Sequence, residues 1–261
     1  MPPVFLPDLR LNATLQGPPG APALVLIHAL GTSLALWDGV AAQLPRHRIL
    51  RLDLRGHGAS DVPPAPYAMG ALVRDVERLI DHFGLTETVV AGVSLGGMIA
   101  QGLAVKRLDL VRGLVLSNTA ARIGTAAQWQ DRIATVREQG LEALADATME
   151  RWLGRGWRDN PAMPGLRAGF VRTDPQGWMG CAAAIAGTDF YETTATLRLP
   201  TLAIAGANDG STPPDLVRET AGLIPGARFQ LIRGAGHLPM AEKPGEYAAI
   251  LGAFLCDIGH G

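Results

Sequence analysis

Thr88-Val89-Val90-Ala91-Gly92-Val93-Ser94-Leu95-Gly96-Gly97 is the stretch that decides the fold of this chain. Its first four residues form a short apolar run that predicts a buried strand, and a helix is predicted from the end of the stretch to about residue 105. The turn between them has the pattern G-x-S-x-G. In this strand–turn–helix context the serine sits on a sharp turn with its hydroxyl exposed, which makes Ser94 a candidate nucleophile.

The residues flanking Ser94 suit such a crowded turn, because three of them are glycines. This turn has two alternative interpretations. A glycine-rich turn whose serine only caps the following helix is the structural alternative. A phosphate-binding turn is excluded, because neither G-x-G-x-x-G nor G-x-x-x-x-G-K-[ST] occurs in the chain.

The rest of the chain alternates short apolar runs with segments of helical periodicity. This rhythm predicts an α/β fold with a mostly parallel sheet flanked by helices. Residues 4–16 read as an early strand or hairpin. Strands are predicted at 23–27, 48–54, 88–91, 111–116, 202–205 and 228–232, and helices at 34–44, 69–83, 95–105, 215–223 and 245–255.

The rhythm changes between about residues 121 and 195, where no clear strand is present. We interpret 121–195 as a helical cap inserted between two parts of the core, 1–120 and 196–261. The cap holds four tryptophans, which either line a pocket or pack helix against helix: Trp129, Trp152, Trp157 and Trp178. Open α/β sheets bind ligands at the carboxyl edge of the strands, over which this insertion is expected to lie.

A serine becomes a strong nucleophile only when a base removes its proton. His237 follows the predicted strand 228–232 in a glycine-rich loop, and Asp209 follows the strand 202–205, so both are expected at the same sheet edge as Ser94. The resulting chain order is serine, acid, histidine. The other place for an acid, after strand 111–116, offers no carboxylate, which supports Asp209.

The oxyanion of an acyl-transfer reaction needs two N–H donors. The amide of Leu95 lies at a helix N-terminus, where N–H groups are free. The second candidate is the amide of Leu30, in the loop after strand 23–27. We interpret Asp53 and His57 as structural turn residues.

Composition excludes several other functions. The chain has 261 residues with 23 basic and 24 acidic side chains, so no global field attracts nucleic acid or an anionic membrane. No apolar run is long enough to span a membrane, and the N-terminus lacks a signal peptide pattern, which favours a cytoplasmic protein.

Cys181 and Cys256 are expected to be reduced thiols. No metal-ligand motif occurs, so neither a metal nor a cofactor is expected. The oligomeric state stays open.

With these residues in hand, the chain resembles the α/β-hydrolases over its whole length, and more narrowly their 3-oxoadipate enol-lactonase group. The resemblance rests on the serine motif followed by Met98, on Arg55-Gly56-His57-Gly58-Ala59-Ser60, and on Ser117-Asn118-Thr119-Ala120-Ala121-Arg122-Ile123-Gly124 followed by Trp129. It implies hydrolysis of a small enol-lactone to 3-oxoadipate in bacterial breakdown of aromatic acids. A carboxylesterase acting on uncharged esters, a cofactor-free haloperoxidase and a small-molecule receptor with vestigial catalysis are the alternatives.

The lactone that this resemblance implies carries a free carboxylate. Burying that charge without a partner would cost several kcal/mol, so a cation is expected to face the pocket. Arg122, just past strand 111–116 where the chain enters the cap, is the candidate, together with Trp129 and Trp152 as further substrate contacts. The alternative is that Arg122 pairs with Asp131 or another acid of the cap.

Overall fold

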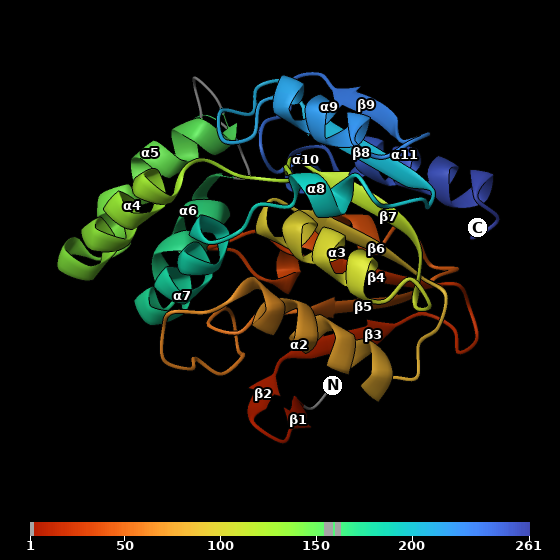
Figure 1. Cartoon of the computed structure of the whole chain (residues 1–261), viewed down its shortest axis with the longest axis horizontal. Coiled ribbons are helices and arrows are strands. Elements are labelled where there is room, and N and C mark those ends of the chain that lie inside the picture. Colours follow the sequence, from red (N-terminus) through yellow and green to blue (C-terminus); the bar gives the residue numbers. More distant parts are fainter. Residues whose placement is uncertain (1–2, 154–158, 160–162) are drawn as a thin grey trace.

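The computed structural model describes residues 3–153, 159 and 163–261 of the chain. Within these residues, seven strands form one sheet in the order β3-β5-β4-β6-β7-β8-β9 (Figure 1). The chain begins with a separate antiparallel hairpin of β1 and β2. The strands are β1 (Val4–Leu6), β2 (Leu9–Leu11), β3 (Ala13–Gln16), β4 (Ala23–Ile27), β5 (Arg48–Leu52), β6 (Thr88–Val93), β7 (Val111–Ser117), β8 (Thr201–Gly206) and β9 (Arg228–Ile232).

The predicted α/β fold with a mostly parallel sheet is confirmed. All neighbouring strands run parallel except β3, which pairs antiparallel with β5. β4 and β6 are buried along their whole length, which explains their continuous apolar sequence, because helices cover both faces of a parallel sheet. β9 lies at the edge and exposes most of its residues.

Helices pack on both sides of this sheet. In Figure 1, α2 and α3 lie side by side on the near face, and α11 lies behind the sheet. The apolar positions of α2 that recur at helical spacing are all buried, so periodicity predicted this face correctly. The helices of the core are α1 (Asp38–Ala41), α2 (Met69–His82), α3 (Leu95–Lys106), α9 (Pro214–Gly222), α10 (Pro239–Glu242) and α11 (Pro244–Asp257).

The segment 34–44 differs from its prediction as one helix. It forms a 3-10 helix, η1 (Leu34–Trp37), and then the single turn of α1. The amide of Leu34 donates to the carboxylate of Asp53 at 2.8 Å, and the Trp37 side chain is fully buried. Tertiary contacts therefore fix the start of this segment in a tighter turn than an α-helix would make.

A group of helices separates β7 from β8 in the chain. They are α4 (Ala126–Gln139), α5 (Glu142–Leu153), α6 (Met163–Arg172), α7 (Pro175–Ala186) and α8 (Tyr191–Thr194). In Figure 1, α4 to α7 stand to one side of the sheet, while α8 lies over α3. Thr125 and Gln128 form a capping box that starts α4, and the Asp174 carboxylate caps α7. The predicted Trp157 lies outside the described residues.

No helix among the described residues is long and apolar enough to cross a membrane.

The start of α3 provides a test of how tightly the serine turn is packed. A Cβ on Gly96 would lie 2.3 Å from the carbonyl oxygen of Ile27, so a backbone would have to move. We expect Gly96→Ala to lower the free energy of unfolding by about 1–3 kcal/mol, the usual cost of overpacking. Gly70 is the matched control, because it is also the second residue of its helix and has open space around it. Gly70→Ala should leave stability unchanged or raise it in urea denaturation, and equal effects of the two variants would contradict this packing.

Candidate active site

Ser94 sits in a strained backbone conformation between β6 and α3. Its φ is 55° and its ψ is −118°, values that a residue with a side chain adopts only when the surroundings impose them. A Cβ on Gly92 would lie 2.1 Å from the carbonyl oxygen of Gly96, so the turn closes only with glycine there. The geometry agrees with the strand–turn–helix junction predicted from the sequence.

The serine faces a cavity of about 230 Å³ between the sheet edge and the α4–α7 helices. His237 lines the same cavity, so the structure brings the predicted nucleophile and base to one space. Leu30 also lines it, as do Trp129 and Trp152. Trp178, another of the tryptophans predicted to line a pocket, also lines this cavity. The side chains of Trp129, Trp152 and Trp178 are all buried.

His237 and Asp209 are in direct contact. The Nδ1 atom of His237 lies 2.8 Å from Oδ2 of Asp209, and both residues are buried. The backbone amides of Ser211 and Thr212 donate to Oδ1 of Asp209, and the Thr212 hydroxyl donates to Oδ2. Burial raises the pKa of Asp209, but the charge of His237 and the side-chain hydrogen bonds from His237, Asn118 and Thr212 outweigh it, so the pKa lies below its usual value. The carboxylate is therefore ionised and can orient the imidazole.

Asn118 at the end of β7 is a member of this site that the sequence reasoning missed. The sequence alone distinguishes this position only by its lack of a carboxylate. Its Nδ2 donates to Oδ2 of Asp209 at 2.7 Å and to the carbonyl oxygen of Gly236 at 3.2 Å. Asn118 thus joins the acid to the loop that carries the histidine. The signal in the sequence was a polar residue directly after an apolar strand.

The end of α5 holds the acid and histidine loops in place. The carbonyl of Arg151 accepts a hydrogen bond from the amide of Gly210, and that of Trp152 accepts one from the amide of His237. The Trp152 ring stacks on the imidazole with ring centroids 5.9 Å apart. Carbonyls at a helix C-terminus lack partners within the helix, and here the loops supply them.

The two backbone amides predicted to receive an oxyanion are those of Leu95 and Leu30. Leu95 is the first residue of α3, so its N–H has no acceptor within the helix. The amide of Leu30 makes no backbone hydrogen bond to the described residues, and Leu30 borders the cavity beside Ser94. Leu30 thus borders the cavity that contains Ser94, and the role of the Leu30 and Leu95 amides as oxyanion donors stays a prediction.

Arg122 is not where it was expected. Its side chain is 55% exposed and pairs with Asp189 at 3.2 Å, and it lies over the Tyr191 ring. It does not line the cavity. The prediction that Arg122 faces the substrate is therefore wrong, because an exposed acid of the same part of the chain draws the guanidinium outward, as the alternative interpretation held.

Two other arginines take that place. Arg132 of α4 and Arg151 of α5 both line the cavity. Arg132 lies 4.7 Å above the Trp129 ring, and Arg151 donates to the Thr148 hydroxyl. Neither forms an ion pair with an acid of the described residues. Burial lowers the pKa of each, and for Arg151 the charge of Arg132 lowers it further while the charge of Glu150 raises it. Arginine stays protonated in proteins, so the cavity carries positive charge that a bound anion would neutralise.

Few other side chains of the described residues are candidates for binding a metal ion. Cys181 and Cys256 are free, and burial raises the pKa of the Cys181 thiol. Over the part of the chain that the structure describes, no group of three or more histidine, cysteine or acidic side chains is placed to hold a metal ion.

Residues 22–244 match the family model of the alpha/beta hydrolase fold. The chain belongs to this family. It is 35% identical over 208 residues to 3-oxoadipate enol-lactonase 2 of Acinetobacter baylyi, covering 78% of each chain, and 31% identical to 3-oxoadipate enol-lactonase 1 of the same organism, covering 95% of this chain and 94% of that one. It is thus similar to enol-lactonases within the family, and is a hydrolase of esters or lactones.

Solved structures agree with this placement. The enol-lactonase from Burkholderia xenovorans LB400 superposes with a TM-score of 0.93 at 33% identity, covering 98% of this chain and all of that one. A thermophilic esterase from Thermogutta terrifontis, solved with malate bound, has a TM-score of 0.91 at 27% identity, covering 98% of this chain and 97% of the esterase.

Proposed function

We propose that this protein hydrolyses a small enol-lactone that carries a carboxylate, namely 3-oxoadipate enol-lactone, to 3-oxoadipate. The observation that carries this proposal is the cavity itself, which is lined by Ser94, His237 and two arginines, Arg132 and Arg151, for which no ion pair is formed with the described residues. The relatives named as 3-oxoadipate enol-lactonases support the same substrate. The reaction would belong to bacterial breakdown of aromatic acids.

In the proposed mechanism Ser94 attacks the lactone carbonyl while His237 accepts the serine proton. Asp209 keeps the imidazole oriented and stabilises its protonated form. The oxyanion of the tetrahedral intermediate is held by the amides of Leu30 and Leu95. The carbonyl–oxygen bond of the ring then breaks, and the enol oxygen leaves with the proton from His237. Because the leaving group stays tethered, the acyl-enzyme contains the whole substrate.

Water completes the reaction. His237 removes a proton from water, the hydroxide attacks the ester carbonyl of the acyl-enzyme, and Ser94 leaves with that proton. The released acid has a second carboxylate in addition to that of the substrate, and the enol rearranges to the ketone. Two arginines in one cavity suit a reaction that starts from one carboxylate and ends with two. The esterase relative solved with malate, a small dicarboxylate, is consistent with this charge requirement.

An uncharged ester is the second candidate substrate, because the same cavity is lined by Trp129, Trp152, Phe170 and Trp178, which give it large apolar walls. The free-energy cost of burying the two arginine charges favours the carboxylate-bearing lactone over the uncharged ester. An uncharged ligand would leave both partly buried guanidiniums without an ion pair in the cavity, whereas a carboxylate supplies one.

Substrate charge gives a direct test. We expect Arg151→Ala to raise KM for the enol-lactone by about 10- to 100-fold, because a hydrogen bond between charged groups contributes about 1.5–3 kcal/mol. KM for phenyl acetate, which is uncharged, should change by no more than about twofold, since that ester offers no carboxylate to a guanidinium. Steady-state kinetics on both substrates measure the difference, and Arg132→Ala should follow the same pattern.

Arg122→Ala is the matched control, because it removes an arginine that pairs with Asp189 outside the cavity. It should leave both substrates unaffected. The substrate assignment is refuted if Arg151→Ala and Arg122→Ala behave alike, or if Arg151→Ala weakens the uncharged ester as much as the lactone.

A further inference from the structure

Three hydrogen bonds join the loop after β4 to the loop after β5. We name residues 28–34 the oxyanion loop, because they include Leu30, and residues 53–59 the β5 loop. The amide of Leu54 donates to Nε2 of His28, the amide of Gly31 donates to Nε2 of His57, and the amide of Leu34 donates to Oδ1 of Asp53, at 2.9, 2.9 and 2.8 Å. The bonds run in both directions between the loops, so each loop constrains the other.

The peptide groups on both sides of the Leu30 Cα are held by these loops. The Ala29 carbonyl accepts from Nδ1 of His28 at 2.7 Å and from the Thr32 hydroxyl at 2.8 Å. A trans peptide is planar, so fixing the direction of that carbonyl also fixes the opposite direction of the Leu30 N–H. On the other side of Leu30, the next amide, that of Gly31, is fixed by His57.

The contact with Gly31 defines the protonation of His57. An N–H donor requires a lone pair on Nε2, so the ring proton is on Nδ1, which faces the carbonyl oxygen of Arg55 at 3.3 Å. Burial, together with the neighbouring His28 ring, lowers the pKa of His57 to about 3, so the neutral form is the one present. Neither the proposed triad nor the cavity uses this imidazole.

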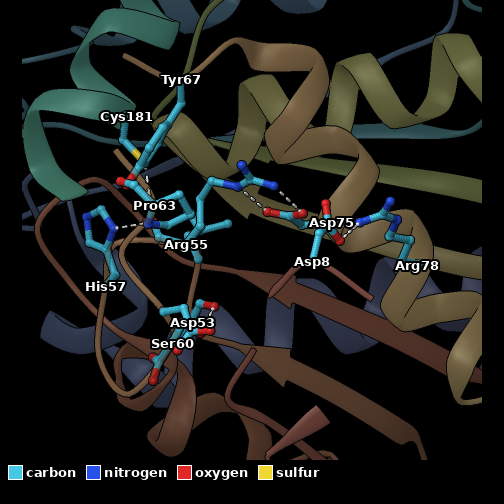
Figure 2. A network of polar contacts seen from close by, with 12 residues as sticks. Asp8, Asp53, Arg55, His57, Ser60, Pro63, Tyr67, Asp75, Arg78 and Cys181 are labelled. Carbon is cyan, nitrogen blue, oxygen red and sulfur yellow. Dashed lines mark hydrogen bonds and ion pairs between the residues drawn. The ribbon is translucent and has the colours of Figure 1, made fainter. Parts of the chain in front are cut away.

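Arg55, whose carbonyl faces His57, is anchored by an ion pair. Figure 2 shows Arg55 between His57 and Asp75, with its guanidinium directed at the Asp75 carboxylate. The two contacts measure 2.6 and 2.7 Å, and Asp75, on α2, is buried. A two-point arginine–carboxylate pair fixes orientation as well as distance. The carbonyl that accepts the hydrogen bond from Nδ1 of His57 therefore belongs to a residue whose side chain is anchored to α2.

We propose that His57 is a positioning residue for the oxyanion hole. By accepting the Gly31 amide, it holds the backbone of the oxyanion loop so that the Leu30 N–H points at the developing oxyanion. The inference rests on the proposed function for the role of Leu30. The effect of His57 is on the transition state, because negative charge develops on the oxygen there and is absent from the bound substrate. Loss of His57 therefore lowers kcat more than it changes KM.

Two substitutions distinguish the effect of the hydrogen bond from the Gly31 amide from the effect of having any polar side chain at position 57. His57→Gln places an amide oxygen near the position of Nε2, where it can still accept from Gly31. His57→Asn reaches only as far as Nδ1 and leaves the Gly31 amide without its partner. The assay is hydrolysis of p-nitrophenyl acetate, which tests oxyanion stabilisation without depending on the lactone. His47→Asn is the control, because His47 is a buried histidine whose Nε2 contacts the His260 carbonyl away from the cavity.

We expect kcat to fall about 100-fold in His57→Asn, comparable with the lower end of the loss of one oxyanion donor, with KM within about threefold. His57→Gln should retain kcat within about tenfold of the wild type. The affinity for a trifluoromethyl ketone, which forms a tetrahedral adduct with a serine, should fall in parallel with kcat/KM. His47→Asn should lower the melting temperature and leave kcat unchanged.

Equal kcat values for His57→Asn and His57→Gln, or a loss in His57→Asn matched by His47→Asn, would overturn the inference. If His57→Asn does not fold, the affinity of His57→Gln for the trifluoromethyl ketone decides. His57→Gln keeps an amide oxygen at the Nε2 position, so near wild-type affinity would support the inference. A loss of affinity far larger than the loss in His47→Asn would overturn the inference. A wild-type protein that hydrolyses the aryl ester but not the enol-lactone would refute the proposed substrate, while the His57 comparison would still decide this inference.

Discussion

Ser94→Ala is expected to reduce turnover of the enol-lactone by about 10⁴-fold or more, the largest effect among the substitutions considered. The substitution removes the nucleophilic oxygen and nothing else. Alanine, like serine, has a Cβ, so the backbone strain at φ 55° is the same in both and the variant should fold as the wild type does. Activity on the lactone and the melting temperature are the two measurements.

Ser117→Ala is the matched control for this change. Ser117 ends the neighbouring strand β7, and its hydroxyl contacts the Tyr247 hydroxyl at 2.5 Å instead of facing the cavity. We expect it to lower stability and to leave kcat unchanged. Near wild-type turnover in Ser94→Ala would show that the reaction does not proceed through this serine.

Asp209→Asn is expected to lower kcat by about 10³- to 10⁴-fold while keeping the fold. An amide in place of the carboxylate can donate to Nδ1 of His237, which favours the wrong tautomer, and it cannot stabilise the protonated imidazole. The folded pKa of Asp209 lies below its usual value, so its contribution to stability is present above the unfolded pKa of about 4 and is lost as the pH falls below it. Urea denaturation at several pH values should show that this pH-dependent contribution to the free energy of unfolding is absent from Asp209→Asn.

Asp53 provides the comparison that would identify a wrong acid. Its carboxylate accepts from Asn12, from the amide of Leu34 and from the amide of Ala59, which is a structural role in the loops beside the sheet. Asp53→Asn should therefore act mainly on stability. If Asp209→Asn is silent while Asp53→Asn abolishes turnover without unfolding the protein, the acid of the site is Asp53.

Local sequence signals predicted most of the core. A buried parallel strand is an apolar run and an amphipathic helix repeats its apolar face, so β4, β6 and α2 were recognisable from neighbouring residues alone. The positions of Ser94, Asp209 and His237 followed from the same strands, because the carboxyl ends of parallel strands meet at one edge of the sheet. The segment 34–44 was less predictable, since the bond from Leu34 to Asp53 is tertiary.

The cationic side of the cavity was not predictable in this way. Arg122 follows a strand and could be placed near the sheet edge, but whether its guanidinium faces in or out depends on Asp189, 67 residues later in the chain. Arg132 and Arg151 lie on helices with weak amphipathic patterns, so the direction in which they face is set by the packing of α4 and α5 against each other and against α6 and α7. Asn118 was also missed, because its importance lies in the two loops that it joins.

The central claim is that the lactone ring opens on Ser94, and rapid-quench mass spectrometry tests it most directly. The wild-type protein is mixed with excess enol-lactone, acid-quenched within one turnover and digested for peptide mapping. We predict a transient adduct on Ser94 that is heavier by the full mass of the lactone, since the leaving group stays attached, and that forms and decays at rates compatible with kcat. Rapid turnover with the peptide containing Ser94 unmodified at every quench time, or an adduct on another residue, would contradict the account.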